Sequence, residues 1–233
     1  MTVLAPNMHP ATPPTGIAAA RARERLPEGE LHVWVARVDD PEPGVTMLDR
    51  TERARAARFR EARTGARWAN AHVLTRQVLA HYTGTSPARL VIRAGRRDKP
   101  VIRRPRSARW LRFNLSHAGG LAMVVVARRA EVGIDIEAIR PLPDLLAVAR
   151  RVLDDSVVRA LSRVGPEESA SRFFHAWVQH EARAKCLGTG LVEASDDARD
   201  PVCCFDLDVG PGYAAAVAST RPVDRIRRWH TTV

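Results

Sequence analysis

Alternating apolar and polar residues predict strands at several places along the chain. ELHVWVARV and VGIDIEAI alternate most clearly, and FNLSH and LAMVVVARR are separated only by Ala118-Gly119-Gly120. Successive side chains of a strand point to opposite faces, so alternation indicates a half-buried strand. A Gly-containing connection of this length is typical of a hairpin. We expect strands over residues 30–38, 88–94, 113–117, 121–129 and 132–139.

Two longer segments show a helical pattern instead. Residues 48–84 predict two helices, broken near Thr64-Gly65 and closed by Gly84. Residues 172–191 predict a helix that runs through Leu187 and stops at Gly188. Glycine just beyond the last apolar position is a common helix stop.

A related pattern occurs twice in the chain. FNLSHAGGLAMVVVA begins at Phe113 and FDLDVGPGYAAAVAS begins at Phe205, and at this offset Phe, Leu, Gly, Ala and Val coincide. Each copy follows a helix that closes at a glycine. We therefore expect an α+β fold (α/β in the broad sense) of two similar halves related by a pseudo-two-fold axis, each with a small antiparallel sheet and packed helices. The expected segments are a disordered, Pro- and Ala-rich tail at 1–28, an N-terminal half at 29–129 and a C-terminal half at 130–233.

Composition excludes several classes of protein. The chain has 233 residues, 45% of them hydrophobic, which is enough for a substantial core. No apolar run approaches the roughly 20 residues of a membrane span, and the N-terminus lacks the pattern of a secretory signal. Three cysteines do not make a disulfide framework, so a reducing compartment is indicated and a cytoplasmic location is expected.

The charge of the chain indicates an anionic partner. The formal net charge is +11, and only Lys99 and Lys185 among the 37 basic residues are lysines. A basic protein can bind nucleic acid, an acidic protein or a phosphorylated small molecule. The excess of arginine over lysine indicates a bias in codon usage. A lysine that is present despite this bias can mark a site that needs a compact ammonium group.

Asp135 and Glu137 place two carboxylates on one face of the strand at 132–139. One interpretation is an ordinary solvated strand face. The other is a cation site, because Mg²⁺ is usually held by one or two carboxylates together with waters and substrate phosphates.

Three further positions allow either a structural or a functional interpretation. Trp177, Glu181 and Lys185 are spaced by four residues and share one helix face. Glu181 is then either the third carboxylate of the cation site or one half of an ordinary surface ion pair with Lys185, beside a packing Trp. His117, at the end of a strand, is a phosphate contact or a structural histidine. Lys99, in a basic turn, is a phosphate contact or a solvated charge.

Three separated motifs together resemble one known family. FNLSH (113–117), VGIDIE (132–137) and FFHAWVQHEARAKCLGTGL (173–191) resemble, in order and spacing, 4′-phosphopantetheinyl transferases of the Sfp type. RRDKP (96–100) and RARAARFREARTGARW (53–68) resemble further family segments, although Asp98 stands where Gly is usual. The resemblance covers roughly residues 30–220.

The resemblance implies a role for each matching residue. Asp135, Glu137 and Glu181 correspond to ligands of Mg²⁺, and Glu181, Glu137 and Lys185 to the catalytic groups. Lys185 corresponds to the residue that contacts the reacting phosphates and assists proton transfer. The implied coenzyme A contacts are Lys185, Ser116, His117, Lys99, Arg67 and Arg55. One departure is Gln179-His180, because the family usually has Lys directly before the Glu.

The implied reaction transfers the 4′-phosphopantetheine arm of coenzyme A to a serine hydroxyl of an apo acyl or peptidyl carrier protein, and releases adenosine 3′,5′-bisphosphate. The resemblance also implies Mg²⁺ as cofactor and a monomer without nucleic-acid or membrane partners. The proton acceptor remains open among Glu181, Glu137 and a metal-bound water. A basic nucleic-acid-binding protein and another Mg²⁺-dependent phosphotransfer enzyme are the alternatives. Against them, aromatic residues make up only 5% of the chain and no GxxxxGK[ST] loop is present.

Overall fold

The computed structural model describes residues 7–10, 26–42, 44–189 and 202–233. Its helices are α1 (Arg50–Ala56), α2 (Ala62–Thr83), α3 (Leu145–Val152), α4 (Asp155–Leu161) and α5 (Pro166–Leu187). Its strands are β1 (Asn7–Pro10), β2 (Glu30–Arg37), β3 (Val91–Ala94), β4 (Pro100–Arg104), β5 (Leu111–Ala118), β6 (Leu121–Arg128), β7 (Val132–Ala138), β8 (Cys203–Asp206), β9 (Tyr213–Ser219) and β10 (Arg225–Thr231). No helix in this described part is long and apolar enough to cross a membrane.

The two halves share one topology, as the repeated sequence pattern predicts. In the N-terminal half the strand order is β2-β6-β5, and in the C-terminal half it is β7-β9-β8. Each half therefore has a first strand, a long helix (α2 or α5) and a hairpin whose second strand pairs with the first. The α+β prediction is confirmed.

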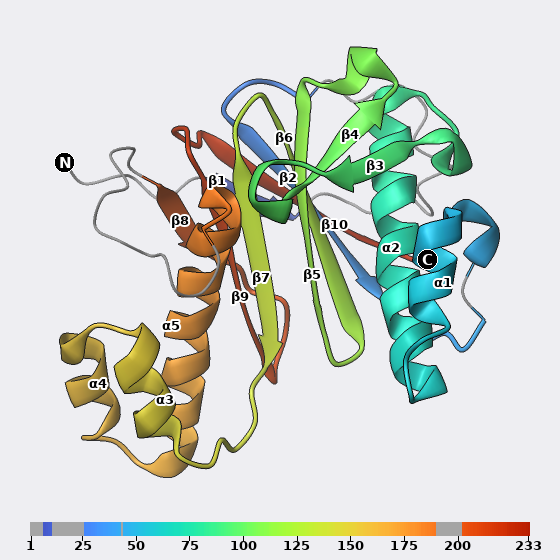
Figure 1. Ribbon diagram of the computed structural model, residues 1–233. Coiled ribbons are helices and arrows are strands. Elements are labelled where there is room, and N and C mark those ends of the chain that lie inside the picture. Colours follow the sequence, from blue (N-terminus) through green and yellow to red (C-terminus); the bar gives the residue numbers. More distant parts are fainter. Residues whose placement is uncertain (1–6, 11–25, 43, 190–201) are drawn as a thin grey trace.

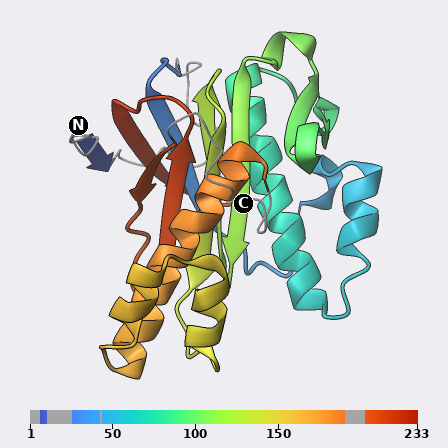
Figure 2. The same cartoon turned by 60° about the vertical axis from the view of Figure 1, so that its left-hand side comes forward.

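The two sheets pack face to face between the two long helices (Figure 1). Residues of β2 and β6 such as Val33 and Val125 meet Ile134 and Ile136 of β7 in a central core. The opposite face of the first sheet packs on α2, and the opposite face of the second packs on α5 (Figure 2). Strands buried on both faces explain the nearly continuous apolar runs in β6 and β9.

The C-terminal strand crosses between the halves, which the sequence did not reveal. β10 follows the C-terminal hairpin in the chain but pairs in parallel with β2 of the N-terminal sheet. The antiparallel order β2-β6-β5 therefore gains a parallel edge that the sequence pattern does not predict. β1 pairs in parallel with β10 at the edge of the same sheet, so residues 7–10 of the expected 1–28 tail form a strand. An edge strand offers unpaired backbone N–H and C=O groups, and these recruit another strand from elsewhere in the chain.

The break between the first two helices lies earlier than predicted. α1 ends at Ala56 and α2 begins at Ala62, so Gly65 lies inside α2 and does not interrupt it. Gly65 is buried where a Cβ atom would stand 2.7 Å from the carbonyl oxygen of Ala56. The glycine is needed because the end of α1 packs against α2.

Two other boundaries differ from the sequence-based expectation. The strand expected from residue 88 begins at Val91, because Pro87–Arg89 forms a 3-10 turn. The helix expected over 172–187 begins earlier, at Pro166, with Glu167 and Glu168 in its first turn. Proline is well suited to the first helical position and acidic residues stabilise the positive end of the helix, so these signals were present in the sequence.

A buried histidine links β2 to α2 and makes the stability of the fold depend on pH. His32 is 1% exposed, and its Nδ1 accepts a hydrogen bond from the Tyr82 hydroxyl at 2.7 Å. Burial lowers the pKa of His32 to about 4, despite the opposing effect of Glu30. The unfolded chain therefore binds a proton between pH 6.5 and about 4 that the folded chain does not bind.

We expect the free energy of unfolding to fall as pH decreases from 6.5 to about 4, by on the order of 3 kcal/mol from His32. Urea denaturation at pH 7, 6 and 5 measures the loss. His32→Gln should remove most of this pH dependence. The matched control His230→Gln, at an exposed histidine, should retain most of it. An equal pH dependence in wild type and His32→Gln would contradict the assignment.

Candidate functional site

The two halves meet where the edge strands β5 and β7 lie side by side (Figure 1). Side chains of β5 join these strands, because Asn114 Oδ1 accepts a hydrogen bond from the backbone N–H of Ile134 at 2.9 Å. Ser116 Oγ accepts a hydrogen bond from the backbone N–H of Ile136 at 3.4 Å. The alternate residues of FNLSH therefore fix the position of the strand that carries the paired carboxylates.

Small residues allow α5 to lie directly on the carboxylate face of β7. Gly133, Asp135 and Glu137 of β7 pair with Ala218, Ala216 and Ala214 of β9, and these alanines contact α5. A Cβ atom on Gly133 would collide with the carbonyl oxygen of Ala182 and the backbone nitrogen of Cys186. The close approach brings the Glu181–Lys185 face of the helix to Asp135.

Asp135, Ser116 and Lys185 form a connected group at this seam. Lys185 Nζ donates to Asp135 Oδ1 at 2.6 Å and to Ser116 Oγ at 3.2 Å. Ser116 Oγ donates to the same Asp135 oxygen at 2.8 Å. Asp135 is only 4% exposed, so a charged carboxylate at this depth needs such partners. Residues from three separate motifs are thus brought into direct contact.

The other two carboxylates lie within electrostatic range of this group. Burial raises the pKa of Glu181, Lys185 lowers it, and Asp135 and Glu137 raise it further. Glu137 Oε2 accepts a hydrogen bond from the guanidinium of Arg140 at 3.3 Å. The site therefore concentrates three acidic groups around one ammonium group.

The carboxylates do not form a closed metal site. Among the described residues, no group of three or more His, Cys, Asp or Glu side chains is arranged to hold a metal ion. However, Asp135 Oδ2 and Glu181 Oε1 are both buried without a hydrogen-bond partner. Buried carboxylate oxygens without partners are costly, and a hard cation is the kind of ligand that would satisfy them. The residues present therefore fit a divalent cation such as Mg²⁺.

The expected contacts to the nucleotide end of coenzyme A lie in part on α1 and α2. Arg55 of α1 lies over the Trp68 ring at 5.7 Å, and Arg67 of α2 donates to Asp39 Oδ1 at 2.8 and 2.6 Å. Burial lowers the pKa of His117, and the nearby His72 and Lys185 lower it further. His117 thus borders the site, whereas no contact joins Arg55 or Arg67 to Asp135 in the described part of the chain. Their roles toward coenzyme A stay predictions.

Lys99 contacts protein groups of both halves. Its Nζ donates to the carbonyl oxygen of Cys186 at 2.8 Å and lies 2.8 Å from Glu131 Oε2. Glu131 Oε1 also accepts from Arg112 at 2.6 Å. Lys99 therefore ties the turn before β4 to the start of β7 and to the negative C-terminal end of α5, one residue after Lys185. Lys99 is therefore not a solvated loop charge, and its contact with the nucleotide stays a prediction.

Lys99→Met is expected to destabilise the fold by about 1–3 kcal/mol, because the Cys186 carbonyl and Glu131 each lose a charged partner. Urea denaturation at neutral pH measures the change. Arg103→Met is the matched control, since the exposed Arg103 makes only a 3.4 Å hydrogen bond to the Ala94 carbonyl. A Lys99→Met midpoint equal to that of the control would show that this tie contributes nothing.

Other residues that the sequence singled out pack against, or form hydrogen bonds with, neighbouring protein groups. Trp177 stacks on Phe173 with ring centroids 5.9 Å apart, which confirms its packing role. Gln179, at the departure from the family pattern, donates to Asp206 Oδ1 at 2.9 Å. The three cysteines are unpaired, and burial raises the pKa of Cys186 to about 12, so this thiol is inert.

Sequence reasoning missed several residues that build the site. Asn114 lies on the same strand face as Ser116, and Gly133 lies on the same face as Asp135, so period-two alternation could have identified both. His72 and Asp39 carried no such signal, because their neighbours His117 and Arg67 are distant in sequence.

Comparison with known proteins places both halves in one family. Residues 131–230 match the family model of the 4′-phosphopantetheinyl transferase superfamily, and residues 33–129 match that of the 4′-phosphopantetheinyl transferase N-terminal region. The chain is 30% identical over 191 residues to the 4′-phosphopantetheinyl transferase HetI of Nostoc sp., covering 79% of this chain and 81% of that protein.

Two other relatives have related names. A putative 4′-phosphopantetheinyl transferase of Synechocystis sp. is 27% identical over 169 residues, covering 71% of this chain and 67% of that protein. The 4′-phosphopantetheinyl transferase AcpT of Escherichia coli O157:H7 is 31% identical over 113 residues, covering 48% and 55%. With both halves matched and the seam cluster assembled from the three quoted motifs, the chain belongs to the 4′-phosphopantetheinyl transferase family and is an enzyme of that type.

Proposed function

We propose that the protein transfers the 4′-phosphopantetheine arm of coenzyme A to a serine hydroxyl of an apo acyl or peptidyl carrier protein, with release of adenosine 3′,5′-bisphosphate. The cluster of Asp135, Ser116 and Lys185 carries this proposal, because it joins the two matched halves at one point. An ammonium group beside buried carboxylates can receive a diphosphate together with a divalent cation. The Sfp-type subclass is part of the same proposal.

Asp135, Glu137 and Glu181 are the residues that would hold Mg²⁺. Support comes from the unpartnered buried oxygens of Asp135 and Glu181. The pKa of Glu181 is also raised, mainly by burial and further by the charges of Asp135 and Glu137. When bound, Mg²⁺ offsets the charge that develops on the leaving phosphate. It would also turn the repulsion among these carboxylates into attraction.

The side chains of the chain itself supply orientation and proton transfer. Lys185 lies between Asp135 and Ser116, so its Nζ can donate to phosphate oxygens while Asp135 keeps the side chain oriented. Asn114 and Ser116 hold β7 in place and thereby fix Asp135. Glu181, Glu137 or a bound water can accept the serine proton, since both carboxylates lie within electrostatic range of Asp135 and Lys185.

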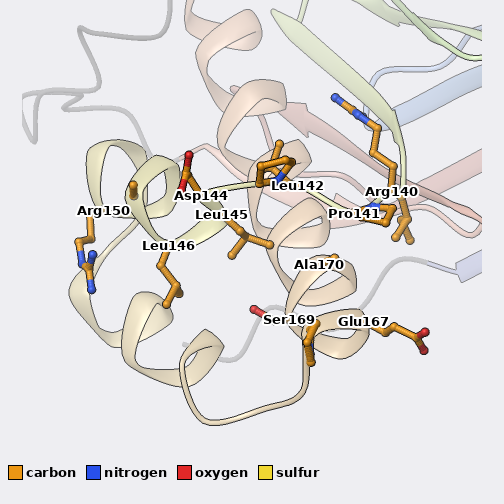
Figure 3. A pocket seen from close by; sticks show the side chains of 14 residues that line it. Arg140, Pro141, Leu142, Asp144, Leu145, Leu146, Arg150, Glu167, Ser169 and Ala170 are labelled. Atoms are coloured by element: carbon orange, nitrogen blue, oxygen red, sulfur yellow. The ribbon is translucent and has the colours of Figure 1, made fainter.

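A pocket beside the site is suited to the carrier protein. It has a volume of about 890 Å³ and lies between α3 and the start of α5. Figure 3 shows Leu142, Leu145 and Leu146 in it, with Arg140 and Arg150 at opposite ends. Arg140 also donates to Glu137, so a protein bound here lies next to the carboxylates. An apolar groove with cationic ends fits an amphipathic acidic helix.

We further propose a cytoplasmic monomer. The three unpaired cysteines suit a reducing compartment. The two halves cover each other's sheet faces within one chain, so no second copy is needed to close the central core.

The test is incubation of the protein with coenzyme A, Mg²⁺ and an apo acyl carrier protein, followed by intact-mass spectrometry of the carrier. A gain of one phosphopantetheine arm is expected, with none on a carrier whose acceptor serine is changed to alanine. Chelation of the metal should stop the reaction, and added Mg²⁺ should restore it. A carrier that stays unmodified across acyl and peptidyl types would refute the proposal.

A further inference from the structure

The positive charge of the chain is concentrated in one short segment. Residues 89–109 contain eight arginines and Lys99 but a single acidic residue, Asp98. This segment of 21 residues therefore carries +8 of the net +11, and the other 212 residues carry +3. We call it the basic hairpin, because it consists of β3, β4 and the turns that flank them.

The arginines of the basic hairpin are exposed, and few are neutralised. The side chains of all eight are exposed, whereas Lys99 is largely covered. Among the described residues, only Arg93 forms an ion pair with a carboxylate, that of Asp49 at 2.9 Å. The remaining seven present their charge to solvent: Arg89, Arg96, Arg97, Arg103, Arg104, Arg106 and Arg109.

The basic hairpin borders the reaction site at one end and extends away from it. Its turn contacts α5, because Lys99 bonds the Cys186 carbonyl and a Cβ atom on Gly188 would stand 3.5 Å from Arg97 Cβ. β4 then runs away from this turn for roughly 13 Å, at about 3.3 Å per residue. The last arginines of the hairpin therefore lie beyond direct reach of a phosphate bound at Lys185. Figure 1 shows β3 and β4 at the opposite end of the molecule from α3, which lines the pocket described above.

We propose that the basic hairpin is an electrostatic steering surface for a carrier protein of negative net charge, separate from the pocket beside α3. This inference rests on the proposed function. A concentrated field of one sign raises the rate of encounter with a partner of opposite charge, and it acts before any close contact forms. Its position at the edge of the seam guides the partner toward Lys185 and the carboxylates.

A protein partner fits this surface better than a nucleic acid does. Residues 89–109 contain no Phe, Trp or Tyr, so the hairpin offers no aromatic platform for stacking bases. Phosphate contacts alone remain available to a nucleic acid, and these would give only non-specific binding.

The experiment compares two triple variants that lose the same charge. The first is Arg103→Gln/Arg106→Gln/Arg109→Gln, which leaves the turn next to α5 intact. The matched control is Arg37→Gln/Arg163→Gln/Arg221→Gln, three exposed arginines elsewhere on the protein. For each protein, kcat/KM for an acidic apo acyl carrier protein is measured at 50 and 400 mM salt, together with KM for coenzyme A.

The hairpin variant is expected to lose about tenfold in kcat/KM for the carrier at low salt and less than about twofold at high salt, with KM for coenzyme A unchanged. The control should stay within about twofold throughout. Equal losses in both variants would show that only net charge matters and would overturn the proposal. A rise in KM for coenzyme A alone, or lost binding to a DNA duplex with carrier kinetics unchanged, would also overturn it.

Failure of the proposed function gives a different result. If the wild-type protein modifies no carrier, transfer is refuted directly, and the hairpin is then tested by fluorescence anisotropy of the labelled carrier protein. Weaker binding by the hairpin variant than by the control at low salt supports the steering surface. Equal binding refutes it.

Discussion

Asp135→Asn is expected to lower the rate of transfer by about 10³-fold or more while leaving the fold intact. The amide nearly matches the carboxylate in shape, and its oxygen can still accept from Ser116. It removes the negative charge that holds Lys185 Nζ at 2.6 Å, and among the described residues it removes one of the two buried carboxylate oxygens that lack a partner. Both the lysine and the proposed Mg²⁺ thereby lose their common anchor.

Initial rates of carrier modification measure this effect, with the thermal midpoint as a check on folding. Asp206→Asn is the matched control, because Asp206 lies on β8 in the same sheet but contacts Gln179 instead of the seam cluster. The control should stay within about twofold of wild type. A rate for Asp135→Asn within tenfold of wild type, at the same Mg²⁺ concentration, would remove Asp135 from the reacting site.

Lys185→Arg is expected to lower kcat at least about tenfold, although the charge is kept. The ammonium group of Lys185 sits between Asp135 Oδ1 and Ser116 Oγ, at 2.6 and 3.2 Å. A planar guanidinium is wider than this gap, and it cannot readily give up a proton during transfer. The substitution keeps the positive charge but removes the compact shape of the ammonium group, so it shows which of the two the reaction needs.

The reverse exchange on the same helix provides the control for Lys185→Arg. Arg183 is exposed on α5, and Arg183→Lys should leave kcat within about twofold of wild type. The thermal midpoints of both variants should agree with that of the wild type. If Lys185→Arg keeps more than about half of the wild-type kcat, the lysine acts only as a charge or lies outside the reacting site.

The sequence by itself determined which residues face the same way within each element. Period-two alternation placed Asp135 and Glu137 on one face of β7, and a spacing of four placed Glu181 and Lys185 on one face of α5. Such faces follow from the local geometry of a strand or a helix, so a short window of sequence is sufficient. The repeated hairpin pattern also predicted two similar halves, and these share one strand order.

Only the tertiary structure decided which faces meet. Nothing in the chain order indicates that β10 joins the N-terminal sheet, that Lys99 bonds the end of α5, or that Ser116 bonds Asp135. These contacts join residues far apart in sequence, and they depend on packing that local periodicity does not encode. Gly133 shows the physical reason most clearly. It matters because it has no side chain, which allows α5 to lie close to β7. A contact between two elements forms only when the chain folds, so a short window of sequence does not reveal it.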